Sequence, residues 1–221
     1  PMRQNDPLAR LLQTGIVAIL RAPDGSRLVD AAQALLAGGV DVMEVTFTVP
    51  HAPKVLEHLA DQLGDKLLLG AGTVLDPETA RVALLAGAQF IVSPAVNLDV
   101  IRLCRRYGKL VLPGALTPTE VLTAWEAGAD IVKLFPSELA GPAYIKALHG
   151  PLPQVRLLPT GGVNLETAAA YIEAGACGLG IGGSLGEAAA LARGDVGRIE
   201  SLARQYVQLV RQARARLGQE T

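Results

Sequence analysis

One phrase recurs four times along the chain and constrains its fold more than any other feature. An Ala-rich amphipathic stretch ends at Gly and an apolar run follows, in the segments LAGGVD (36–41), LAGAQF (85–90), EAGADI (126–131) and EAGACG (173–178). The Gly suits a left-handed helix cap, and the apolar run suits a strand that is buried on both faces. The phrase therefore predicts a series of helix-to-strand units.

Eight apolar runs follow one another at a spacing of about 23 residues, with a helical pattern between neighbours. The runs are 16–20, 42–47, 67–72, 90–93, 110–114, 131–135, 155–160 and 178–183. This alternation predicts an α/β fold, a (β/α)8 TIM barrel that forms a single domain over residues 1–221. The runner-up is an open doubly wound sheet. Such a sheet predicts a Gly-rich turn after the first strand, and RAPDGS (21–26) fits that turn poorly.

Several polar residues stand where the predicted helices begin. Asp76-Pro77 and Thr117-Pro118 each pair an N-cap residue with proline at the first helical position. Asn97 and Asn164 are N-cap candidates for the helices that follow them. These signals support helices between the predicted strands.

The chain ends in a predicted amphipathic helical stretch from about residue 184 to 216, with a break at GDVG (194–197). An arginine-rich helix face is typical of a solvated surface, and the net charge of the chain is −1, which argues against nucleic acid as a partner. The arginines are Arg198, Arg204, Arg211, Arg214 and Arg216.

The composition excludes several other classes of protein. The two cysteines, Cys104 and Cys177, do not make a disulfide framework and favour a reducing compartment. No apolar run approaches the roughly 20 residues that span a bilayer. The histidines His51, His58 and His149 lack the spacing of a zinc site. We therefore expect a cytoplasmic protein with no metal, no cofactor and no membrane partner.

The predicted strands end in residues that can carry chemistry. In a TIM barrel the active site lies at the carboxyl ends of the strands. Because side chains alternate along a strand, Lys133 shares one face with Ile131 and Phe135, and Glu44 shares one with Val42 and Thr46. The residues at these ends are Arg21, Glu44, Thr46, Thr48, Thr73, Ser93, Pro94, Pro113, Gly114, Lys133, Phe135, Thr160, Gly161, Gly162, Gly182, Gly183 and Ser184.

Lys133 stands in the apolar run IVKLF (131–135), where burial favours the neutral amine and lowers its pKa. A neutral amine attacks ketones to form a Schiff base, and a neighbouring glutamate such as Glu44 can move the protons that this chemistry requires. That pairing describes a class I aldolase. The structural alternative is a buried ion pair that plugs the barrel, since such pairs perturb pKa values without catalysis.

Two Gly-rich turns, TGGVN (160–164) and IGGSLG (181–186), follow the seventh and eighth predicted strands. Barrels of this fold often bind phosphate at these positions, and glycine lets backbone N–H groups approach the phosphate oxygens. A helix that begins at Ser184 would direct its positive end toward the anion. One Gly-Gly turn is weak evidence, whereas two on consecutive strands indicate a phosphate site.

Eight motifs resemble the 2-keto-3-deoxy-6-phosphogluconate (KDPG) aldolase family, whose relatives include 4-hydroxy-2-oxoglutarate (KHG) and 2-keto-3-deoxy-6-phosphogalactonate (KDPGal) aldolases. The motifs run in order from about residue 10 to 190: AILRA, EVTFTVP, GAGTV, FIVSP, LPGALTPTE, VKLFPSE, GPAYIKALHGP and LLPTGGVN. The resemblance implies a homotrimeric barrel that cleaves a phosphorylated keto-sugar acid to pyruvate and glyceraldehyde 3-phosphate without metal.

The resemblance also implies a role for individual residues. Lys133 is similar to the Schiff-base lysine and Glu44 to the acid/base. Three residues resemble pocket walls and three the phosphate cradle. The wall residues are Thr73, Pro94 and Phe135, and the cradle residues are Gly161, Gly162 and Ser184. We also expect their neighbours Thr160, Gly182 and Gly183 to contact the substrate.

One position departs from the family pattern. Many members carry an arginine shortly after the glutamate, where this chain has Thr48. Arg21 is then the candidate for binding the substrate carboxylate, because an arginine guanidinium can bind a carboxylate bidentately. The departure leaves the choice among KDPG, KDPGal and KHG open. A phosphosugar isomerase or epimerase, and a barrel that serves as a natural or engineered oligomeric scaffold, are the competing functions.

Overall fold

The computed structural model describes residues 6–23, 25–186, 190 and 193–218, in which helices and parallel strands alternate. The strands are β1 (Ile16–Leu20), β2 (Val42–Thr46), β3 (Leu68–Gly72), β4 (Phe90–Val92), β5 (Leu110–Leu112), β6 (Gly114–Ala115), β7 (Val132–Leu134), β8 (Leu157–Pro159) and β9 (Leu179–Ile181). The α-helices are α1 (Pro7–Thr14), α2 (Leu28–Ala37), α3 (Ala52–Leu63), α4 (Pro77–Leu85), α5 (Leu98–Arg106), α6 (Pro118–Glu126), α7 (Gly141–His149), α8 (Ala168–Glu173) and α10 (Val196–Arg216). Two short 3-10 helices, η1 (Gly64–Lys66) and η2 (Ser137–Leu139), complete the described elements.

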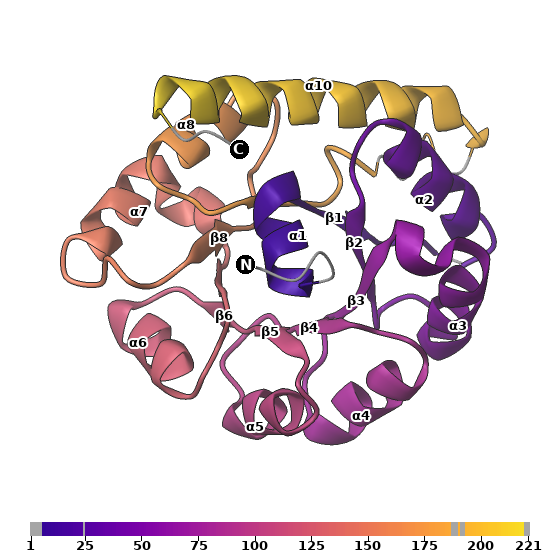
Figure 1. Cartoon of the computed structure of the whole chain (residues 1–221), viewed down its shortest axis with the longest axis horizontal. Helices are drawn as coiled ribbons and strands as arrows, with labels where there is room; N and C mark the ends of the chain where they lie inside the picture. Colours follow the sequence, from indigo (N-terminus) through magenta and orange to yellow (C-terminus); the bar gives the residue numbers. More distant parts are fainter. Residues whose placement is uncertain (1–5, 24, 187–189, 191–192, 219–221) are drawn as a thin grey trace.

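The strands form two parallel sheets inside a ring of helices (Figure 1). Six strands pair in the order β5-β4-β3-β2-β1-β9, and three pair in the order β6-β7-β8. A single bridge between Thr160 and Gly180 joins the β8 side to the β9 side. The α/β class and the curled parallel sheet are thus as the sequence predicts.

One predicted strand is split in two. The run 110–114 contains Pro113, which has no N–H to donate, and it separates β5 from β6. β5 pairs with β4, whereas β6 pairs with β7, where Gly114 lies opposite Lys133. The chain therefore passes from the larger sheet to the smaller one at this proline, and the predicted uninterrupted eight-stranded ladder is not what the described hydrogen bonds form.

Side chains alternate between two apolar layers, which confirms the predicted faces of the strands. Ile131 belongs to an inner cluster, while Val132 and Leu134 belong to the layer beneath the helices. Val42 is likewise inside, whereas Met43 packs outward. The inner cluster consists of Leu11, Val17, Val42, Leu68, Phe90, Val92, Leu112, Ile131 and Leu158. The inner faces are therefore filled and form a core at one end of the strands.

Helix α1 closes that end of the strands, and the sequence analysis did not predict it. Its signals are those of the predicted helices: Asp6 accepts a hydrogen bond from the Leu8 N–H, Pro7 follows, and Gly15 ends the helix in the left-handed conformation. In Figure 1 the helix lies over the centre of the ring. Leu8 and Leu11 pack on the inner cluster, so α1 covers apolar side chains that would otherwise meet water.

Arg214 connects α10 to the last turn of α1 and to the segment that precedes β9. Its guanidinium is buried and donates to the carbonyl oxygens of Gln13 and Leu12, both at 2.8 Å, and of Cys177 at 3.0 Å. The first two carbonyls belong to the last turn of α1, whose orphan acceptors favour a cation. Helix α10 itself packs between α2 and α8.

We expect Arg214→Met to lower the free energy of unfolding by about 2–4 kcal/mol, because three partly buried carbonyls lose a charged donor while the packing volume is kept. Chemical denaturation measures this change. The matched control is Arg211→Met, an exposed arginine on the same helix, which we expect to stay within about 0.5 kcal/mol of the parent. Equal losses in the two variants would contradict the role given to Arg214.

Most predicted helix starts are confirmed. The Asp76 carboxylate accepts from the Thr79 N–H at 2.6 Å, and Thr117 forms a capping box with Glu120. Asn97 accepts from two N–H groups at the start of α5. Asn164 instead caps a turn, and α8 begins only at Ala168. Asn164 thus caps the turn that leads into α8, and its carbonyl oxygen accepts from the Ala168 N–H at 2.9 Å, where the helix begins.

The C-terminal stretch is divided as the GDVG segment predicts. Gly194 has a φ of 71°, and α10 begins at Val196. At Ser184 the chain forms a turn in which Leu185 and Gly186 donate to the Gly182 carbonyl. Residues 187–189 and 191–192, over which the predicted helix from Ser184 would run, lie outside the described residues.

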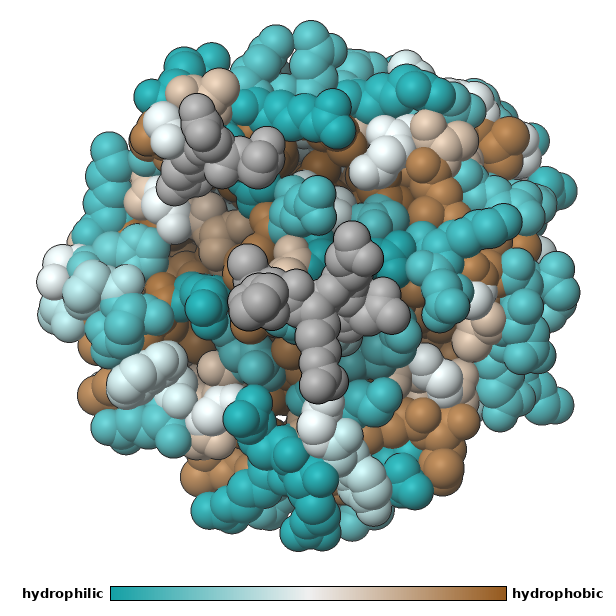
Figure 2. Space-filling model, viewed as in Figure 1, coloured by the Kyte–Doolittle hydropathy of each residue, from teal (hydrophilic) through white to brown (hydrophobic). Residues whose placement is uncertain are grey.

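The surface on the α1 side is mainly hydrophilic along α10, and apolar atoms reach it between the helices (Figure 2). Among the helices of the described ranges, none combines the length and the apolar character needed to cross a bilayer.

Candidate active site

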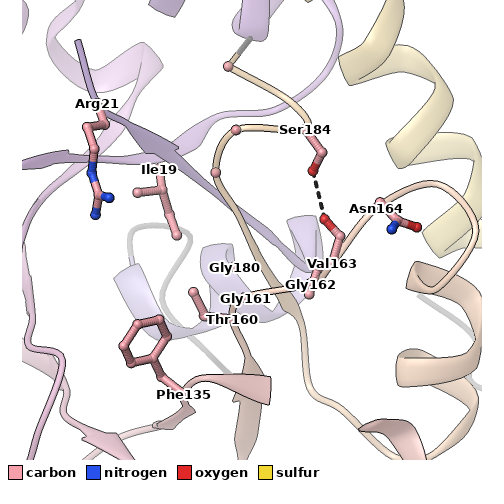
Figure 3. Close-up of a pocket in the computed structure, with 13 residues that line it drawn as sticks. Ile19, Arg21, Phe135, Thr160, Gly161, Gly162, Val163, Asn164, Gly180 and Ser184 are labelled. Carbon is pink, nitrogen blue, oxygen red and sulfur yellow. Dashed lines mark hydrogen bonds between the residues drawn. The ribbon is translucent and has the colours of Figure 1, made fainter. Parts of the chain in front are cut away.

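A cavity of about 470 Å³ opens at the carboxyl ends of β1, β7, β8 and β9. The side chains of Ile19, Arg21 and Phe135 point toward one space, beside the turn that contains Gly161 and Gly162 (Figure 3). The lining residues are Ile19, Arg21, Phe135, Thr160, Gly161, Gly162, Val163, Asn164, Gly180, Gly182, Gly183, Ser184 and Gly186. Of the ten substrate-contact residues predicted from the sequence, eight line this cavity.

Glu44 and Lys133 lie in the interior beside this cavity rather than among its lining residues. Both side chains are buried, with exposed fractions of 1% and 7%. The Glu44 carboxylate extends over Gly72 of the neighbouring strand, where an added Cβ would overlap its Oε1 atom. Glycine at position 72 therefore provides the space in which the carboxylate sits.

Burial changes the protonation of both groups in opposite directions. Desolvation raises the pKa of the Glu44 carboxyl above its ordinary value, and the positive charges of Lys133 and Arg21 oppose this rise. Desolvation lowers the pKa of the Lys133 ammonium, which the Glu44 carboxylate opposes and the Arg21 charge reinforces. Burial thus moves each pKa toward the uncharged form of its group, and the attraction between the two charges acts against this shift.

Phe135 stands close to the amine. The Lys133 Nζ lies 5.0 Å from the centroid of the Phe135 ring, and the peptide between Phe135 and Pro136 is cis. The ring also lines the cavity, so the amine lies close to one of the cavity's lining side chains.

The turn after β8 presents unused backbone donors. Gly162 and Val163 have N–H groups with no acceptor among the described residues, whereas the Gly161 N–H faces the Gly180 carbonyl in the bridge between the two sides. Gly161 and Gly162 have φ values of 91° and 68°, a conformation that glycine adopts without strain. Successive free N–H groups in such a turn form a concave site for an anion.

The Ser184 hydroxyl is already engaged. Its Oγ donates to the Val163 carbonyl oxygen at 2.7 Å, which joins the turn after β9 to the turn after β8 (Figure 3). The hydroxyl proton is therefore unavailable to a ligand. The backbone N–H of Ser184 has no acceptor within the described part of the chain and is left for an anion.

Thr160 carries a buried polar atom without a partner. Its Oγ1 makes no hydrogen bond to any described residue, and the side chain lines the cavity. An added Cβ at Gly180 would overlap this oxygen, so the glycine keeps room for it. A buried unpaired hydroxyl is costly, and one that faces a cavity is a hydrogen-bond partner for a bound molecule.

Thr73 and Pro94 are not among the residues that line the cavity. Thr73 follows β3 directly and has a φ of 56°, which is unusual for a β-branched residue and is a strained conformation often found at functional sites. The Pro94 backbone lies against Gly114, which is paired with Lys133 across the sheet. Both residues are thus placed near Glu44 or Lys133 rather than near the Gly-rich turns.

The described residues contain no group of three or more His, Cys, Asp or Glu side chains placed to hold a metal ion.

The model of the "KDPG and KHG aldolase" family matches residues 8–202, which is most of the chain. The chain belongs to the KDPG and KHG aldolase family. Aldolases are lyases, and this protein is an enzyme of that class.

The similar proteins include aldolases for two epimeric substrates. This aldolase is 40% identical to the 2-dehydro-3-deoxy-6-phosphogalactonate aldolase of Escherichia coli (strain K12), over 77% of this chain and 83% of that protein. It is 39% identical to the 2-dehydro-3-deoxy-phosphogluconate aldolase of Treponema pallidum (strain Nichols), over 93% and 96%. Among solved structures, it is 28% identical to KDPG aldolase from Legionella pneumophila with pyruvate captured as a covalent carbinolamine, with a TM-score of 0.82, over 91% and 98% of the two chains.

Sequence reasoning missed five residues that line the aldolase cavity: Ile19, Val163, Asn164, Gly180 and Gly186. Alternation gives a signal for the first, because Ile19 is two positions from Arg21 and so shares its face. The others lie in or next to the two Gly-rich turns and carry no chemistry-bearing side chain except Asn164.

The Thr48 hydroxyl of this aldolase lies 2.8 Å from that of Thr46, and the two share a hydrogen bond. Thr46 is buried and also donates weakly to the Leu20 carbonyl oxygen, at 3.4 Å. Thr48 is exposed and carries no positive charge. Arg21 is therefore the cation that lines the described cavity.

Proposed function

We propose that this aldolase is a class I enzyme that cleaves 2-keto-3-deoxy-6-phosphogluconate to pyruvate and D-glyceraldehyde 3-phosphate, with Lys133 as the Schiff-base lysine. The observation that carries the proposal is the buried Lys133 amine beside the buried Glu44, each with its pKa shifted toward the uncharged form. The covalent carbinolamine in the Legionella pneumophila relative supports the same chemistry.

In the proposed mechanism the neutral Lys133 amine adds to the C2 ketone and forms a carbinolamine. Loss of water, with protons moved by Glu44, gives the imine. Removal of the C4 hydroxyl proton then drives cleavage of the C3–C4 bond, whose electrons pass to the imine and leave an enamine as the aldehyde departs. Protonation of the enamine at C3 and hydrolysis release pyruvate and restore Lys133.

We propose that the substrate lies with its carboxylate at Arg21 and its phosphate on the Gly-rich turns. The cradle consists of the free N–H groups of Gly162 and Val163 and those of the turn Gly182–Ser184. The Thr160 hydroxyl, which has no protein partner, donates to or accepts from a substrate hydroxyl between the two ends. Phe135, Thr73 and Pro94 are the proposed walls near the carbon chain.

KDPGal is the alternative substrate, and KHG, which yields pyruvate and glyoxylate, is a further one. The phosphogalactonate and phosphogluconate relatives are similarly close, at 40% and 39% identity, so the two epimers are both proposed. Comparing kcat/KM for the three substrates tests the assignment. No turnover of any of them would overturn it.

We expect Arg21→Ala to weaken pyruvate and the full substrate alike, because both carry the carboxylate and lose a charge-assisted partner worth on the order of 2–5 kcal/mol. Steady-state kinetics and the pyruvate concentration that half-saturates imine trapping measure the two effects.

The control is Gly162→Leu at the other end, where the added side chain would overlap Glu138 and displace the turn. This variant should raise KM for phosphorylated substrates and leave pyruvate nearly unchanged. If Arg21→Ala impairs only phosphorylated substrates, Arg21 belongs to the phosphate end and the proposed orientation is reversed.

Three further proposals concern the whole molecule. The two sheets form one closed (β/α)8 barrel and a single domain, which the Thr160–Gly180 bridge and the continuity of β5 with β6 support. The protein is cytoplasmic, which its two free cysteines support. It is a homotrimer, for which exposed apolar side chains at Leu75, Val82, Leu85 and Leu98 supply contact surface. A monomeric mass by sedimentation would overturn the trimer.

A further inference from the structure

The turn after β8 combines two properties that oppose one another. Gly161 and Gly162 let an anion approach the backbone closely, but glycine is also the residue whose peptide groups rotate most freely. A cradle of N–H groups binds an anion well only when those groups already point at it. The described contacts of this turn show what holds its peptide groups in place.

Each of four successive carbonyl oxygens in the turn accepts a hydrogen bond. The Ser137 N–H donates to the Thr160 oxygen at 2.9 Å, and the Ser137 hydroxyl donates to the Gly161 oxygen at 2.6 Å. The remaining two are held by other hydroxyls: Thr167 Oγ1 donates to Gly162 O at 2.9 Å, and Ser184 Oγ to Val163 O at 2.7 Å. The donors come from three separate segments, which follow β7, β8 and β9.

A held carbonyl fixes the N–H of the same peptide group, because the C=O and N–H of a planar trans peptide point in opposite directions. Ser137 does not line the cavity, whereas Gly161 and Gly162 do. The Gly161 carbonyl points toward Ser137 and the Gly162 carbonyl toward Thr167, so the N–H groups of the same two peptides, those of Gly162 and Val163, point away from these side chains and toward the cavity that both residues line. These two N–H groups have no acceptor among the described residues.

We infer that Ser137 and Thr167 form a hydroxyl clasp that pre-orients the N–H groups of Gly162 and Val163 in the β8 turn toward a phosphate group. Ser137 and Thr167 are positioning residues, since they act through the backbone and do not contact the ligand. The inference rests on the proposed function for the identity of the anion as the substrate's phosphate. It adds that the affinity for phosphate is set by hydroxyls outside the cavity.

Ser137 has a second contact that provides a matched control. Its carbonyl oxygen accepts from the Tyr171 hydroxyl at 3.1 Å, a buried bond that does not touch the turn. Tyr171→Phe removes one hydrogen bond at Ser137, as Ser137→Ala does, but leaves all four carbonyls of the turn engaged. A role for Ser137 in general stability alone predicts similar behaviour of the two variants.

The test measures the dissociation constant of inorganic phosphate by calorimetry for the wild type, Ser137→Ala, Thr167→Val and Tyr171→Phe. We expect this constant to rise roughly tenfold in Ser137→Ala and Thr167→Val and less than about twofold in Tyr171→Phe, because only the first two changes release a carbonyl whose peptide N–H binds the anion. The KM for the phosphorylated substrate should rise in parallel, with kcat and the exchange of pyruvate methyl protons unchanged. Because Ser137 is buried, Thr167→Val serves if Ser137→Ala does not fold.

The outcomes separate the clasp from the proposed function. Equal dissociation constants for phosphate in the wild type, Ser137→Ala and Thr167→Val would overturn the clasp alone. Wild-type protein that does not bind phosphate overturns both the clasp and the phosphate end of the proposed function. A wild type without pyruvate exchange overturns the Schiff-base function, while the calorimetric comparison still decides the clasp. An equal loss in Tyr171→Phe assigns Ser137 to stability and overturns its positioning role.

Discussion

Lys133→Met is expected to abolish aldol cleavage, with a loss on the order of 10⁴-fold or more, while the protein remains folded. The amine is indispensable for the imine, and no other nucleophile can replace a covalent step. The fold should persist because methionine fills a similar volume and removes the cost of burying an amine that is only 7% exposed. Circular dichroism and a thermal melt check the fold beside the activity assay.

Trapping with borohydride identifies the lysine directly. Wild-type protein incubated with pyruvate and borohydride should gain one reduced adduct, which peptide mass spectrometry places on Lys133. The control Lys146→Met removes an exposed lysine of α7 and should retain the adduct in full. An adduct that persists in Lys133→Met, or that maps to another lysine in the wild type, would end the assignment.

Glu44→Gln should keep the shape of the site and lower the rate by about 10²–10⁴-fold, because the proton carrier is lost. Exchange of the methyl protons of pyruvate with solvent reports that proton transfer and should collapse. Exchange at the wild-type rate would show that another group moves the proton, such as a water molecule held by Thr73.

The same substitution has a second, opposite effect on Lys133. The Glu44 carboxylate raises the pKa of the Lys133 ammonium, against the larger lowering by burial, so its removal lowers that pKa further. A lower pKa makes the amine neutral at lower pH. The pH profile of borohydride trapping should therefore shift to lower pH in Glu44→Gln, even as proton exchange is lost. A shift to higher pH would show that Glu44 does not act on Lys133 as a neighbouring negative charge.

The residues proposed for the covalent step and those proposed to bind the phosphate lie on different parts of the fold. Lys133 and Glu44 stand within strands whose ladders fix the backbone on both sides, with Gly114 opposite one and Gly70 opposite the other. The anion donors stand on turns, where glycine allows close approach and hydroxyls from other segments restrict the motion. A covalent step requires a rigid amine, whereas a phosphate requires several donors aimed at one point.

The sequence alone was sufficient for most of the helices and strands and for the polar residues at the strand ends. Helix and strand patterns are local, and a Gly after an Ala-rich helix or a Pro after Asp76 marks a boundary without reference to the rest of the chain. Alternation along IVKLF assigned Lys133 and Phe135 to one face. The four glycines Gly161, Gly162, Gly182 and Gly183 were found by a different signal, because glycine pairs at the ends of consecutive strands are visible in the sequence.

What the sequence could not determine depends on residues that are far apart in it. The space for Glu44 depends on Gly72, the Ser184 hydroxyl is taken by Val163, and Arg214 reaches carbonyls about two hundred positions earlier. Pro113 divides a strand because its two halves find different neighbours. A side chain's choice of partner is settled by distance and burial in the folded chain, and only the tertiary structure brings those partners within hydrogen-bonding reach.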